Sequence, residues 1–117
     1  MYERYQKAVH DASGSFSVTQ DDLAGAALVD VRRAGVFEQA TKMVPGATWR
    51  DPAQVAQWSR DLPADRPVVV YCVYGHEVGR ATALRLRAAG VDARFLRGGI
   101  DGWQAAGRPV DSKPGSA

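Results

Sequence analysis

The 117-residue chain has a single cysteine, Cys72, and no strong excess of either charge. One cysteine excludes an internal disulfide framework and any zinc site built from several thiolates. Fifteen basic residues against thirteen acidic ones leave a formal net charge of +2, and the basic residues are scattered along the chain. This balance gives no reason to expect a nucleic-acid partner or binding to a membrane surface.

Long apolar runs are also missing from the sequence. The longest, residues 68–73 (VVVYCV), has six residues, whereas a membrane-spanning helix needs about twenty. Residues 1–14 (MYERYQKAVHDASG) contain no apolar centre of the kind that a secretory signal needs. We therefore expect a cytoplasmic protein, in which the Cys72 thiol stays reduced.

The size and composition are those of one globular domain. The chain is 45% hydrophobic and 24% charged, which is ordinary for a folded domain of this length. We expect residues 1–14 to be a flexible N-terminal segment, residues 15–110 to form the domain and residues 111–117 (DSKPGSA) to be a flexible tail.

Apolar runs alternate with amphipathic stretches within this domain. Strands are predicted at residues 15–18, 27–31, 68–72 and 92–96, with a further short strand that ends near Trp49. Helices are predicted at residues 19–24, 35–41, 51–60 and 79–89, and a last short helix after residue 98. This alternation indicates an α/β domain with a mostly parallel sheet. The continuous β-branched run indicates that the strand at residues 68–72 is covered on both faces.

Cys72 lies at the carboxyl end of that strand, where ligands collect in parallel α/β sheets. Residues 72–79 (CVYGHEVG) then lead into a helix, and Gly75 and Gly79 allow a tight backbone path. Such a loop turns backbone N–H groups toward a common point, and the helix dipole adds partial positive charge there. An anion would be held at this point, and the reactive thiolate of Cys72 would be favoured. On position alone, the alternative of a small buried cysteine in the core stays open.

Four motifs, taken in order, resemble those of single-domain rhodaneses. They are residues 28–32 (LVDVR), 44–47 (VPGA), 68–75 (VVVYCVYG) and 96–109 (LRGGIDGWQAAGRP). The likeness covers residues 15–110, and it extends to rhodanese domains that occur beside chromate-resistance proteins in bacteria. It implies a rhodanese-like α/β fold, with about five parallel strands flanked by helices on both faces.

The resemblance also implies a sulfurtransferase. Cys72 would take a sulfane sulfur from thiosulfate or a persulfide, become a persulfide itself and pass the sulfur to cyanide or a thiol, including a protein thiol. Backbone N–H groups of the loop would stabilise the negative charge of the persulfide. No metal or organic cofactor is implied. The implied substrate-binding residues are Val73, Tyr74, Gly75, His76, Glu77 and Val78.

Two other functions were weighed against sulfur transfer. Rhodanese relatives that act on phosphate or arsenate have a loop one residue longer, usually with an arginine six residues after the cysteine. Here that position is Val78 and the nearest arginine is Arg80, so the arginine that would grip a tetrahedral oxyanion is missing. This argues against a phosphatase or an arsenate- or chromate-type reductase. The second alternative is a non-enzymatic sulfur carrier or regulatory interaction module, and the intact Cys72 loop argues against it.

Three charged residues are expected at the same edge of the sheet. Asp30 and Arg32 are expected mainly to fix the loop after their strand by hydrogen bonds and an ion pair, and Arg32 stays a candidate for attracting anions. Arg80, in the first turn of its helix, is a further candidate. Glu77 would repel a dianionic donor such as thiosulfate if it faces the site, which favours a persulfide donor.

The role of His76 has two open interpretations. His76 is a candidate local cation or proton shuttle, or else a loop residue that only shapes the site. A metal site built from His10, Cys72 and His76 has no supporting ligand spacing, and no metal is expected.

Overall fold

A computed structural model describes residues 16–75 and 77–114. Its centre is a five-stranded sheet in the order β1-β6-β5-β2-β4. All neighbouring strands in it are parallel, so the predicted α/β fold is confirmed. The strands are β1 (Ser17–Val18), β2 (Ala27–Asp30), β4 (Thr48–Trp49), β5 (Val68–Tyr71) and β6 (Ala93–Leu96).

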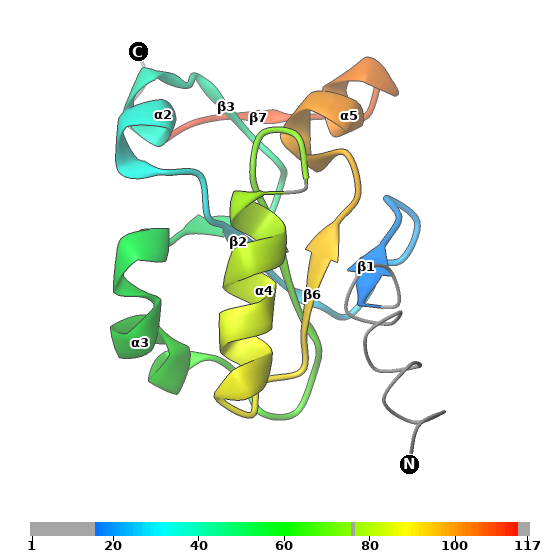
Figure 1. Ribbon diagram of the computed structural model, residues 1–117. Coiled ribbons are helices and arrows are strands. Elements are labelled where there is room, and N and C mark those ends of the chain that lie inside the picture. Colours follow the sequence, from blue (N-terminus) through cyan, green and yellow to red (C-terminus); the bar gives the residue numbers. More distant parts are fainter. Residues whose placement is uncertain (1–15, 76, 115–117) are drawn as a thin grey trace.

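Helices cover both faces of this sheet. They are α2 (Ala34–Gln39), α3 (Val55–Trp58), α4 (Val78–Ala88) and α5 (Gly99–Ala105), with 3-10 turns η1 (Pro52–Gln54) and η2 (Ser59–Asp61) on either side of α3. Figure 1 shows α3 and α4 together in front of the sheet. The connection from β5 to α4 lies at the upper end of the sheet, between α2 and α5 (Figure 1).

The side chains of β5 alternate between the two faces of the sheet, and each set belongs to a different hydrophobic core. Val68 and Val70 pack with apolar side chains of α3 and α4. Val69 and Tyr71 pack with Trp103 of α5 on the opposite face. All four β5 side chains are buried, which confirms the prediction of a strand covered on both faces. Each buried valine contributes about 1.5–3 kcal/mol relative to an exposed one, so the strand that carries Cys72 is rigidly held.

The prediction of a helix at residues 19–24 is wrong, because these residues form only a turn. The Thr19 backbone amide and hydroxyl donate hydrogen bonds to Asp22 Oδ2 at 3.0 and 2.7 Å. The bond from the Thr19 hydroxyl is the main reason why the pKa of Asp22 lies below its ordinary value, and the bond from the Thr19 amide adds to it. These contacts resemble those that begin a helix, but Gly25 follows with φ +77°, and this left-handed residue turns the chain toward β2.

The helix predicted at residues 51–60 is present in interrupted form. Asp51 caps its start as predicted, since its carboxylate accepts a hydrogen bond from the Ala53 amide at 2.9 Å. The helical run is then 3-10, α and 3-10 in turn, and the Trp58 indole donates to the Asp51 carbonyl at 2.7 Å. The segment is therefore a compact corner packed on the sheet rather than one regular helix.

Ordered structure continues beyond Val110, where the sequence placed the end of the domain. β7 (Asp111–Ser112) pairs with β3 (Lys42–Met43) in a second, antiparallel sheet. Lys113 Nζ donates to the carbonyls of Phe37 and Glu38 at the end of α2, at 2.8 and 3.0 Å. The flexibility of the tail expected at residues 111–117 stays a prediction, and the structure adds that residues 111 and 112 form a strand. The expected N-terminal segment, residues 1–14, lies outside the described residues.

None of the helices within residues 16–75 and 77–114 is long and apolar enough to cross a lipid bilayer.

The pairing of β7 leads to a prediction about stability. Deleting residues 111–117 should lower the free energy of unfolding by about 1–2 kcal/mol, because it removes the β3–β7 ladder and both Lys113 hydrogen bonds. Deleting residues 115–117 alone is the control, and this deletion should change the free energy of unfolding by less than about 0.5 kcal/mol. Urea unfolding followed by tryptophan fluorescence measures both. Equal stability of the two shortened proteins would contradict a stabilising role for β7.

Candidate active site

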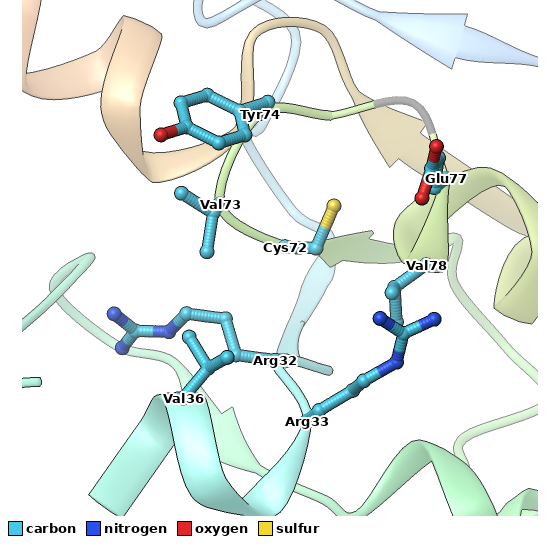
Figure 2. A pocket seen from close by; sticks show the side chains of 8 residues that line it. All are labelled: Arg32, Arg33, Val36, Cys72, Val73, Tyr74, Glu77 and Val78. Carbon is cyan, nitrogen blue, oxygen red and sulfur yellow. The ribbon is translucent and has the colours of Figure 1, made fainter. Parts of the chain in front are cut away.

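Cys72 is the first residue after β5 and lies on a cavity of about 270 Å³ at the carboxyl edge of the sheet. This residue is only 6% exposed. Figure 2 shows the sulfur pointing into the space enclosed by the β5–α4 loop, with Val73 and Tyr74 on one side and Glu77 on the other. The lining residues are Arg32, Arg33, Val36, Cys72, Val73, Tyr74, Glu77 and Val78.

The loop after Cys72 is fixed through its carbonyl groups. The Cys72 carbonyl accepts a hydrogen bond from the Ile100 amide at 3.0 Å, and the Val73 carbonyl accepts one from the Asp101 amide at 2.9 Å. Both amides belong to the first turn of α5, whose N–H groups have no partner within their own helix. Gly99 begins this turn with φ +56°, and a Cβ there would overlap the carbonyls of Cys72 and Val73. The contact therefore requires glycine at position 99.

Gly75 and Gly79 bring the backbone close to the sulfur, as the sequence predicted. The Gly75 amide donates to Cys72 Sγ at 3.3 Å. Gly75 has φ +86°, and a Cβ there would lie 2.6 Å from the Gly98 nitrogen. A Cβ on Gly79 would lie 3.3 Å from Cys72 Sγ. Side chains at these positions would push the loop and the start of α4 away from the thiol.

Several backbone donors of the loop after Cys72 have no hydrogen-bond acceptor in the described residues. The amides of Val73, Tyr74 and Glu77 donate no hydrogen bond within the part of the chain that the structure describes. The eleven-residue helix α4 begins at Val78, and its N-cap residue Glu77 makes no side-chain capping bond. The positive end of the helix dipole therefore lies at the site, and the carboxylate of Glu77, which lines the same cavity, offsets part of it. This arrangement can hold negative charge beside Cys72.

Asp30 and Arg32 form a buried ion pair that fixes the chain after β2. Their side chains are 0% and 4% exposed. Arg32 Nε donates to both Asp30 carboxylate oxygens at 3.0 Å, and its terminal nitrogen donates to Oδ2 at 2.6 Å. The same terminal nitrogen also donates to the Lys42 carbonyl at 2.9 Å. In Figure 2 the Arg32 guanidinium extends away from the Cys72 sulfur. This geometry supports loop fixing as the role of the pair, because the cation is already neutralised.

Tyr71 adds a neutral group to this buried cluster. Its hydroxyl accepts a hydrogen bond from the Val44 amide at 3.2 Å. Burial first, and then the negative charge of Asp30, raise the pKa of Tyr71 far above its ordinary value of 10.0. The phenol is therefore protonated at neutral pH and does not serve there as a base or an added negative charge.

Arg33 is the cation that the sequence analysis missed. It directly precedes α2, is exposed and lines the Cys72 cavity. Among the described residues it forms neither a capping bond nor an ion pair. The available signal was its place immediately after Arg32, at the edge of the sheet where Cys72 lies. Arg80, which the sequence proposed instead, is not among the residues that line this cavity.

The other predicted residues divide into two groups. Val73, Tyr74, Glu77 and Val78 line the cavity, so the condition under which Glu77 repels a dianion is met. His76 lies outside the described residues, as does His10, so their proposed roles stay predictions. In residues 16–75 and 77–114, no group of three or more His, Cys, Asp and Glu side chains is placed to hold a metal ion.

Two apolar side chains at the mouth of the cavity are unusually exposed. Tyr74 was predicted as a substrate-binding residue and is 63% exposed. Val36 of α2, which the sequence analysis did not single out, is 45% exposed. Figure 2 shows Tyr74 above the sulfur and Val36 below it. They give the entrance an apolar rim beside the charged Arg33 and Glu77.

Comparison with known proteins agrees with this geometry. Residues 13–106 match the family described as Rhodanese-like domain. The chain is 31% identical over 80 residues to the thiosulfate sulfurtransferase GlpE of Pseudomonas syringae pv. syringae, covering 68% of this chain and 74% of that protein. It is also 31% identical over 103 residues to a sulfurtransferase of Allochromatium vinosum, covering 88% and 94%. A solved protein from Lactobacillus plantarum has a similar fold, with a TM-score of 0.76 at 22% identity over 97% of this chain and 100% of that one.

The close fit of the loop leads to a prediction on two glycines. Gly75→Ala should lower the free energy of unfolding by about 3 kcal/mol or more, because it adds a backbone clash to the cost of a left-handed residue. Gly90→Ala is the matched control. Gly90 has φ +89°, but a Cβ at this position would meet no atom within 4 Å, so the substitution should lower the free energy of unfolding by only about 1–2 kcal/mol. Urea unfolding of both variants measures the difference. Equal losses would show that the loop moves to accept a side chain without penalty.

Proposed function

The chain belongs to the rhodanese-like domain family, and from this membership we propose that it is a sulfurtransferase that carries the transferred sulfur on Cys72. One observation carries the proposal. Cys72 lines an open cavity near the start of α4, and the amides of Val73, Tyr74 and Glu77 in the loop that follows it donate no hydrogen bond in the described part of the chain. A nucleophilic thiolate and the negatively charged persulfide formed from it both gain from such donors.

The proposed reaction has two steps. In the first, the Cys72 thiolate attacks the outer, sulfane sulfur of thiosulfate. A bond forms between Sγ and that sulfur, the sulfur–sulfur bond of thiosulfate breaks, and sulfite leaves with the electron pair. In the second, cyanide or a thiolate attacks the outer sulfur of the Cys72 persulfide, and Sγ leaves as a thiolate. Thiocyanate or a new persulfide is released, and the protein returns to its starting state.

Each part of the loop has a proposed role in these steps. The Gly75 amide, 3.3 Å from Sγ, stabilises the thiolate. The other backbone donors of the loop are proposed to stabilise the negative charge of the outer sulfur once it is bound. No metal and no organic cofactor enters the reaction, because the bond changes are all at sulfur. The Asp30–Arg32 pair acts as a positioning element for the cavity wall.

The charges at the entrance bear on the choice of donor. Arg33 attracts an anion to the cavity, whereas Glu77, which also lines it, repels one. A dianion such as thiosulfate therefore meets opposing charges at the rim. A persulfide, which carries less charge on its reacting group, meets less opposition and is our preferred donor. The expected setting is the cytoplasm, where the thiol stays reduced.

A non-enzymatic carrier or interaction module is the second candidate function. The exposed side chains of Tyr74 and Val36 at the entrance favour it, because exposed apolar side chains suit contact with a protein. In that role Cys72 holds a persulfide until a protein thiol accepts it. Reductase or phosphatase chemistry finds less support, since Val78 occupies the place of the oxyanion-gripping arginine.

The covalent step has a direct test. Incubation with thiosulfate or with a persulfide donor should add one sulfur atom to the intact protein, and cyanide should remove it, because the sulfur is held in a persulfide. Intact-protein mass spectrometry measures both changes. Cys72→Ser should show no addition while keeping the circular dichroism spectrum of the parent. An equal gain of sulfur by the variant, or none by the parent with either donor, would refute the proposed carrier residue.

The opposing charges at the rim give a second test. Glu77→Gln should raise kcat/KM for thiosulfate by about two- to fivefold, and Arg33→Gln should lower it by a similar factor, as expected for exposed charges. Both effects should shrink at high salt. Arg60→Gln removes one exposed charge that does not line this cavity and should have no effect. Initial rates of thiocyanate formation measure all three; identical rates for Glu77→Gln and Arg33→Gln would show that rim charge does not select the donor.

A further inference from the structure

The residue that follows the C-terminal strand holds the last turn of α2. In Figure 1 β7 (red) crosses the upper end of the molecule between α5 and α2. Nζ of Lys113, the residue after β7, donates to the carbonyls of Phe37 and Glu38 at 2.8 and 3.0 Å. The backbone amide of Lys113 donates to the Thr41 carbonyl, beyond the end of the helix, at 2.8 Å. One residue therefore holds this part of the chain through both its side chain and its backbone.

Helix α2 depends on outside contacts for its position. It has six residues, none of them buried, and it has neither a side-chain cap at its start nor a basic residue in its last turn. Helices shorter than about twelve residues are marginal on their own in water. The Lys113 ammonium group supplies the positive charge that the carbonyl end of a helix favours and that α2 itself lacks.

The ring of Phe37 adds a second anchor at the same place. It stacks on the Trp49 indole, with ring centroids 4.7 Å apart and an interplanar angle of 10°. Lys113 Nζ lies 4.6 Å from the centre of the Phe37 ring, within the range of a cation–π contact. The Trp49 indole also donates to the Arg32 carbonyl at 2.8 Å, immediately before Arg33. Connected side chains from β4, α2 and the residue after β7 therefore fix both ends of α2.

This group bears on the Cys72 cavity through the residues that α2 places there. Arg33 directly precedes α2 and Val36 lies in it, and both line the cavity. We propose that Lys113 is a positioning residue for this cavity: by holding α2, it keeps the Arg33 charge and the Val36 side chain at the cavity wall. The effect on sulfur transfer rests on the proposed function, whereas the effect on the wall does not.

Three substitutions test this role. Lys113→Met removes the ammonium group and keeps the backbone bond to Thr41. Lys113→Arg keeps a cation that can donate to the carbonyls of α2. Lys42→Met is the matched control, because Lys42 pairs with Ser112 in the same small sheet, is exposed and makes no ion pair in the described residues. Each change removes less than the deletion of residues 111–117, so all three proteins should stay folded, which circular dichroism verifies.

Kinetics separate positioning from a purely structural role. With cyanide as acceptor, Lys113→Met should raise KM for thiosulfate about two- to fivefold, the effect expected of one exposed charge, and leave kcat unchanged. Lys113→Arg and Lys42→Met should retain the KM of the parent. In a protein that already carries Arg33→Gln, Lys113→Met should have no further effect on KM, because the charge that Lys113 positions is gone. A lower kcat at constant KM, or an equal rise of KM with and without Arg33, would overturn the proposal.

The accessibility of Cys72 tests the cavity wall without any sulfur transfer. Cys72 is 6% exposed, so its surroundings limit the access of iodoacetamide to the thiol. Lys113→Met should raise the rate of alkylation about tenfold, because a hydrogen bond from a charged group favours the held position of α2 by about that factor. Lys42→Met should not change this rate, which intact-protein mass spectrometry measures.

The two measurements distinguish this inference from the proposed function. Faster alkylation of Lys113→Met, in a protein whose Cys72 never gains sulfur, would support the positioning role and refute the transferase. Sulfur transfer by the parent, with the same alkylation rate in Lys113→Met and the parent, would overturn the positioning role and keep the transferase.

Discussion

Two hydrogen bonds from the first turn of α5 to the carbonyls of Cys72 and Val73 determine the shape of the active-site loop. Once the carbonyls face α5, the loop amides face other directions, and one of them reaches Cys72 Sγ from Gly75. The contact is so close that Gly99 and Gly75 leave no room for a side chain. Donors that a helix end leaves unpaired thus satisfy the acceptors of the loop, and the donors of the loop stay available to a ligand.

The charges near the site divide into a buried set and an exposed set with different roles. Asp30 and Arg32 are buried and fully engaged with each other, and separating such a pair costs about 3–5 kcal/mol. Their contribution to the field in the cavity is small because the charges cancel at close range. The exposed Arg33 and Glu77 therefore set the charge that an incoming molecule meets. The fixed shape of the loop after β2 and the charge at the cavity entrance therefore depend on different side chains.

The sequence predicts those parts of the fold that depend on a single local pattern of residues. The run at residues 68–72 is apolar and β-branched, so both the central strand and the place of Cys72 at its end could be inferred. Residues 111–114 have no such pattern, since β7 is held by backbone pairing and by the Lys113 ammonium group. Residues 19–24 contain contacts typical of a helix start, but they form only a turn before the left-handed Gly25. Arg33 was missed because the direction of a side chain after a strand depends on the path of the following turn.

The division between buried and exposed residues also separates the part of the site that is fixed by packing from the part that can vary. The Cys72 loop is held by β5, α4 and α5, all packed in the two cores, so its geometry has little freedom to change. Arg33 directly precedes α2 and Val36 lies on its exposed surface, where substitutions usually alter stability by less than about 0.5 kcal/mol. The wall of the Cys72 cavity can therefore change while the loop that holds Cys72 keeps its geometry.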